Sequence, residues 1–137
     1  MAIGLLSSAA AYYFVGQRRM QEAAEAVESQ EQLGLESLRR TLRHWDDAVR
    51  LAEHTPRGQL LDPISRLQEL KRSTESLNSN CMTYGGMGAL RLGMEVGISA
   101  FLQHLRAGND QFDPASLDYM RERMSVGVRA LQTNCGL

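Results

Sequence analysis

The chain has 137 residues, about the length of one domain and enough to bury a hydrophobic core without stabilising metals. Its 15 basic and 16 acidic side chains nearly cancel, which argues against a nucleic-acid partner or attraction to an anionic surface. Its two cysteines form no CxxC pair, which argues against the usual zinc and c-type haem sites.

The N-terminal residues 1–16, MAIGLLSSAAAYYFVG, contain no charged side chain, and QRRM follows them directly. As a helix this stretch would be about 24 Å long, shorter than the roughly 30 Å hydrocarbon core of a bilayer. Gly4 with Ser8, and Ser7 with Ala11, place small residues four apart, which lets another membrane helix approach closely. We therefore predict a short transmembrane anchor over residues 1–17 that packs against integral membrane protein subunits. The alternatives are a cleaved signal peptide and a buried helix of a soluble fold.

The next segment, residues 18–34, is rich in Ala, Glu and Gln and predicts a solvated helical stalk. It continues into a first bundle helix, predicted over 35–54 and ending near Pro56 and Gly58. In that helix the apolar residues recur at alternating spacings of three and four, as in a helix that faces other helices. They are Leu35, Leu38, Leu42, Trp45, Val49 and Ala52.

Two similar five-residue segments, LDPIS at 61–65 and FDPAS at 112–116, each predict the start of a helix. Asp62 and Asp113 are expected to act as N-caps, followed by Pro63 and Pro114 at a position where the missing N–H is no loss. The second bundle helix is predicted over 63–82 and the fourth over 114–134. Each segment finishes with Asn-Cys.

The third bundle helix, predicted over 86–107, carries small residues every fourth position: Gly85, Ala89, Gly93 and Gly97. Each glycine inside a helix costs about 1 kcal/mol of helix stability relative to alanine. We expect close contact with the backbone of another helix to offset that cost.

Together these patterns predict an all-α fold, in which an N-terminal membrane-anchor helix continues into an antiparallel up-down four-helix bundle over residues 35–137. The second and fourth helices would run the same way, so Cys81 and Cys135 would meet at one end and form a disulfide. Those helices are diagonal in a square bundle, so their ends must converge to bring the Cα atoms within about 7 Å. Two buried free cysteines are the alternative.

The predicted disulfide and the arginines after the anchor indicate opposite sides of the membrane for the bundle. A disulfide predicts an oxidising space such as the periplasm, the intermembrane space or a lumen. Arg18 and Arg19 lie on the bundle side of the anchor, which favours the cytoplasm. We expect a single-pass protein with its bundle on the oxidising side.

No catalytic set, metal-ligand spacing or cofactor motif is present in the sequence, so we expect no enzyme activity, no metal and no cofactor. Trp45, Arg91 and Glu95 are candidates for a small-molecule pocket, although Trp45 also suits a core position and Arg91 with Glu95 suits a surface pair.

The expected function is that of a non-catalytic accessory, structural or assembly subunit of a larger membrane complex. The alternative is a membrane-tethered, extracytoplasmic sensor or ligand-binding module. In architecture alone, such a module resembles the sensory domains of bacterial chemoreceptors.

Overall fold

The computed structural model describes the backbone of residues 2–137 and the side chains of residues 18–137. The predicted all-helical class is confirmed, because this range contains helices and turns but no β-strand. The α-helices are α1 (Ala2–Glu53), α2 (Leu61–Ser73), α3 (Asn80–Gly85), α4 (Met87–Arg106) and α5 (Asp118–Cys135). Short 3-10 helices occur at η1 (Arg57–Gln59), η2 (Thr74–Ser76) and η3 (Pro114–Leu117).

The chain divides into two units, residues 1–34 and 35–137. In the first, every side chain from Arg18 to Gln30 is exposed, and Met20 and Val27 are 77% and 56% exposed. The predicted anchor contacts of Gly4, Ser7, Ser8 and Ala11 lie outside the described side chains. Among the described residues, no helix combines the length and the apolar character that crossing a bilayer requires.

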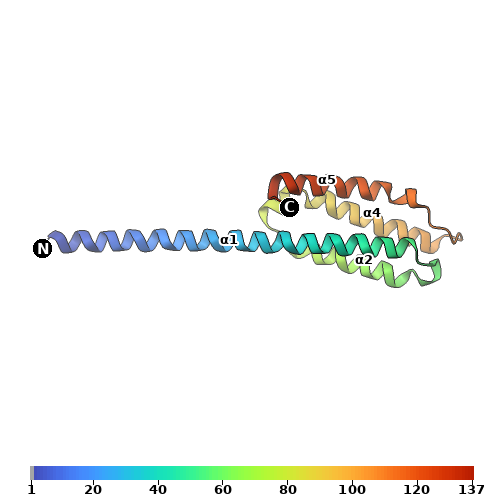
Figure 1. Cartoon of the computed structure of the whole chain (residues 1–137), viewed down its shortest axis with the longest axis horizontal. Helices are drawn as coiled ribbons and strands as arrows, with labels where there is room; N and C mark the ends of the chain where they lie inside the picture. Colours follow the sequence, from blue (N-terminus) through green and yellow to red (C-terminus); the bar gives the residue numbers. More distant parts are fainter. Residues whose placement is uncertain (1) are drawn as a thin grey trace. The chain divides into compact units, whose positions relative to one another are not determined.

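The second unit is a helical bundle, in which the C-terminal part of α1 and the helices α2, α4 and α5 lie side by side (Figure 1). Helix α4 packs against both α2 and α5, and α3 packs against α5. The predicted apolar stripe of α1 faces this core, since all its members are buried except the half-buried Leu42. The largest fully buried side chains include Trp45, Phe101, Leu38, Leu67, Met94 and Leu131.

The prediction of one continuous helix over residues 63–82 is wrong. Helix α2 ends at Ser73, η2 follows, and Leu77 and Ser79 adopt non-helical backbone angles before α3 begins at Asn80. The stretch STESLNSN, residues 73–80, explains the break, because Ser, Thr and Asn side chains compete for backbone hydrogen bonds. The hydroxyls of Ser73 and Thr74 donate to carbonyls three residues earlier, at 2.7 and 2.6 Å. The Ser79 hydroxyl then caps α3 by accepting from the Met82 amide at 3.3 Å.

The two Asp-Pro segments differ in whether their aspartate caps a helix. Asp113 accepts a hydrogen bond from the Ala115 amide at 3.0 Å, and Pro114 begins η3, which leads into α5. Asp62 caps nothing, because α2 already begins at Leu61, and Pro63 is its third residue. Leu60, between η1 and α2, has a fully buried side chain.

Candidate functional site

Helices α4 and α5 approach each other closely through glycines. A Cβ atom added to Gly93 would lie 2.9 Å from the Met124 amide nitrogen, and one added to Gly97 would meet the Met120 side chain. Gly86, between α3 and α4, has a φ of +142°, which side-chain-bearing residues rarely adopt. The expected close packing of the glycine edge is therefore present at Gly93 and Gly97, with α5 as the neighbour.

The same contact contains a residue that the sequence analysis missed. A Cβ atom on Gly127 of α5 would lie 2.7 Å from the Leu90 amide nitrogen and 2.9 Å from the Gly86 carbonyl oxygen. Gly127 is buried, whereas Ala89, which the four-residue spacing had included, is only half-buried. The sequence contains a signal for it, because Gly127 lies at helical spacing between Met124 and Leu131, and a glycine inside a helix costs helix stability.

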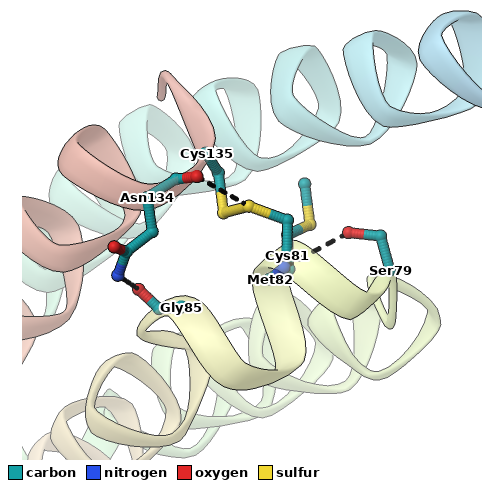
Figure 2. The surroundings of a disulfide bond; sticks show 6 residues. All are labelled: Ser79, Cys81, Met82, Gly85, Asn134 and Cys135. Atoms are coloured by element: carbon teal, nitrogen blue, oxygen red, sulfur yellow. Dashed lines mark hydrogen bonds between the residues drawn. A yellow bond between two sulfur atoms is a disulfide. The ribbon is translucent and has the colours of Figure 1, made fainter.

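The sulfur atoms of Cys81 and Cys135 lie 2.07 Å apart, at the distance of a disulfide bond, and their Cα atoms are 5.7 Å apart. Figure 2 shows that Cys81 lies in α3 and that Cys135 lies at the end of α5. The Asn134 side-chain amide donates to the Gly85 carbonyl at 3.2 Å, and the Asn134 carbonyl oxygen lies 3.1 Å from the Cys81 sulfur. Gly85 is buried here, since its Cβ would lie 3.0 Å from the Cys135 sulfur. This cluster joins α3 to the end of α5.

Arg91 ties α4 to the end of α2. Its Nη2 donates to the Thr74 carbonyl at 2.5 Å and to the Leu77 carbonyl at 3.4 Å. Its Nε donates to the Thr74 hydroxyl at 3.3 Å. The Thr74 carbonyl also accepts from the Leu77 amide at 3.0 Å, so Arg91 adds a charged donor to the backbone carbonyls at the break after α2.

Replacing Arg91 with methionine is expected to lower the free energy of unfolding by about 2 kcal/mol, because hydrogen bonds from a charged donor to part-buried acceptors are lost. The measurement is urea denaturation followed by circular dichroism. Lys71→Met is the matched control, since it removes a cation 4.0 Å from the exposed Glu95 carboxylate. Such a surface pair is worth under about 0.5 kcal/mol. Equal losses in the two variants would contradict the bridging role of Arg91.

The three candidates for a small-molecule pocket do not share one. Trp45 is fully buried and lies beneath a groove of about 420 Å³ between α1 and α5, whose other lining residues include Leu42, Val49 and Met124. Arg91 is turned toward Thr74 of η2, and Glu95 is exposed beside Lys71 of α2. The buried Trp45 Nε1 has no hydrogen-bond acceptor. The structure thus separates Trp45 from the other two residues.

Among the described residues, no three His, Cys, Asp or Glu side chains lie close enough together to hold a metal ion. No protein-family model, curated protein or solved structure matches the chain. The features available for function are therefore the disulfide cluster, the α4–α5 contact, the Trp45 groove and the exposed helical surfaces.

Proposed function

We propose that the protein is a non-catalytic accessory, structural or assembly subunit of a larger membrane complex, which it contacts through its N-terminal segment and its helical bundle. In this proposal residues 1–17 form a short anchor that packs among the transmembrane helices of partner subunits. The bundle, which takes the up-down four-helix form, lies on the oxidising side of the membrane.

The observation that carries the proposal is the exposed part of α1 between Arg18 and Gln30. Met20 and Val27 are seven residues apart, so they lie on the same side of the helix. Helices in proteins are stabilised mainly by packing of an apolar face, and this part of α1 has every side chain exposed. Contact with a partner would provide that packing.

The cysteine pair supports the proposed location. Its disulfide distance is consistent with an oxidising compartment, because such bonds persist there and are rare in reducing ones. Together with the charge-free residues 1–16, this favours a membrane-bound protein whose bundle faces a periplasm, an intermembrane space or a lumen.

The test is purification of the tagged full chain from its native membrane after mild solubilisation. We expect a larger membrane assembly to co-purify at constant stoichiometry, and Val27→Glu to reduce its yield several-fold, because the substitution puts a charge on the exposed apolar side of the helix. Ser29→Glu is the control, since it adds the same charge to another side of the same segment.

Recovery of the chain only as a free monomer or homodimer would contradict the subunit proposal. The remaining candidate would then be a ligand-binding or sensory module. The groove above Trp45 favours that alternative, because its volume of about 420 Å³ falls in the range of small-molecule sites.

A further inference from the structure

The groove between α1 and α5 lies between two polar contacts that join these helices. Toward one end Glu53 lies 2.9 Å from Arg121, and beyond the other end the Arg39 guanidinium donates to the Gly136 carbonyl at 3.1 Å. Most of the lining between these contacts is apolar, and each apolar member is buried or half-buried. These members are Leu42, Trp45 and Val49 of α1, and Met120, Met124 and Val128 of α5.

Trp45 carries an unsatisfied hydrogen-bond donor at this groove. Its ring reaches across to α4, because a Cβ atom added to Gly97 would lie 3.4 Å from the Trp45 Cζ2 atom and would also contact the Met120 sulfur. The indole Nε1 is buried and has no acceptor among the described residues, although the N–H of a buried tryptophan usually has one. A buried donor without a partner is rare in native proteins, and here it indicates an acceptor oxygen supplied by a bound molecule.

The charged residues at the edge of the groove balance one another. Asp46 and Arg50 of α1 are exposed, and Glu53 of α1 is paired with Arg121 of α5. Two acids and two arginines leave no net charge that would attract an ionic ligand. A charged group would also lose its hydration on entering the apolar interior of the groove. The groove therefore favours an uncharged molecule.

The two methionines of the lining can open a path to the indole. Trp45 is fully buried, so a ligand reaches its Nε1 only when a neighbouring side chain moves. Met120 packs against the same glycine as Trp45 does, and Met124 lines the groove one turn further along α5. Methionine is unbranched and has three rotatable bonds, so it adapts its shape to a neighbour more readily than other apolar residues do.

We propose that the groove between α1 and α5 binds an uncharged, apolar small molecule whose carbonyl oxygen accepts a hydrogen bond from Trp45 Nε1. The apolar body of this ligand packs against Met124 and Val128, and the balanced edge charges stay in water. Binding gives the buried donor its acceptor. The proposed site belongs to the bundle alone, so a failure to bind such a ligand would leave the co-purification test of the membrane complex unaffected.

The test is NMR spectroscopy of the purified full chain with isotopically labelled tryptophan. Trp45 is the only tryptophan, so the chain gives a single indole N–H signal. The probe is methyl cyclohexanecarboxylate, an uncharged ester. We expect it to move this signal downfield and to saturate with a dissociation constant of about 1 mM or lower. The cyclohexanecarboxylate anion, which has the same ring but a charge, should bind at least about 10-fold more weakly.

The substitution Ser125→Phe tests where the probe binds. Ser125 is exposed and lines the groove, so the larger side chain should occupy it and weaken ester binding at least about 10-fold. Ser99→Phe is the matched control, because Ser99 is an exposed helical serine of α4 outside this groove, and it should leave binding unchanged. Circular dichroism melting verifies that both variants are folded.

Three results would overturn the proposal. The first is an indole N–H signal that the ester does not move. The second is equal binding of the ester and the carboxylate. The third is a Ser125→Phe variant that binds the ester as well as the Ser99→Phe variant does.

Discussion

Replacing Gly127 with alanine is expected to lower the free energy of unfolding by about 3 kcal/mol, although alanine is the better helix former. The added methyl group would lie 2.7 Å from the Leu90 amide nitrogen and 2.9 Å from the Gly86 carbonyl oxygen. Both atoms belong to the backbone, so no side-chain rotation relieves the contact. The helices α4 and α5 would have to move apart. Urea denaturation followed by circular dichroism measures the change.

Gly88→Ala is the matched control. Gly88 lies in the first turn of α4, and a Cβ atom added there meets nothing within 4 Å. The same chemical change should therefore raise the free energy of unfolding, by up to about 1 kcal/mol. Opposite signs at the two glycines would demonstrate the close approach of the helices. A neutral or stabilising Gly127→Ala substitution would contradict it.

Removing the disulfide, by the double substitution Cys81→Ser with Cys135→Ser, is expected to lower the free energy of unfolding by about 4 kcal/mol. The bond joins residues 54 positions apart, and the chain-entropy relation assigns that cost to the release of such a loop in the unfolded chain. The measurement is the shift of the urea midpoint under non-reducing conditions.

Reductant supplies the control for this prediction. Adding a dithiol should shift the midpoint of the wild-type protein by the same amount and leave the double serine variant unchanged. In native membranes, a membrane-impermeant maleimide should label the two cysteines only after reduction. Labelling without reductant, or a midpoint that neither treatment moves, would show that the cysteines are not bonded and would remove the support for an oxidising compartment.

The regular parts of the fold could be predicted from the sequence. The third bundle helix, expected over 86–107, matches α4 at Met87–Arg106 within one residue at each end. The expected inward series from Leu35 to Ala52 is buried apart from the half-buried Leu42, and Asp113 caps η3 as its type and position suggested. These features follow from short-range rules, because helical periodicity and capping depend on residues within one or two turns.

The errors arose where contacts distant in sequence compete with local preference. The series Leu67, Leu70, Thr74, Leu77 continues a helical spacing, but the chain leaves the helix after Ser73. Arg91, 17 residues beyond Thr74, donates hydrogen bonds to the Thr74 and Leu77 carbonyls at this break. A spacing of four also placed Arg91 next to Glu95, although the structure directs the two side chains to different neighbours.

The sequence by itself determined the helical class, the inward sides of the long helices and the presence of an unusual glycine edge, because each depends only on the spacing of residue types along a single helix. Only the tertiary structure decided how the two cysteines meet. A continuous second helix would have ended diagonally from the fourth, whereas the break lets the short α3 pack directly on α5 and brings the Cα atoms to 5.7 Å. It also decided that Gly127 faces Gly86 and Leu90, because the backbone distance between two helices depends on the side chains of both.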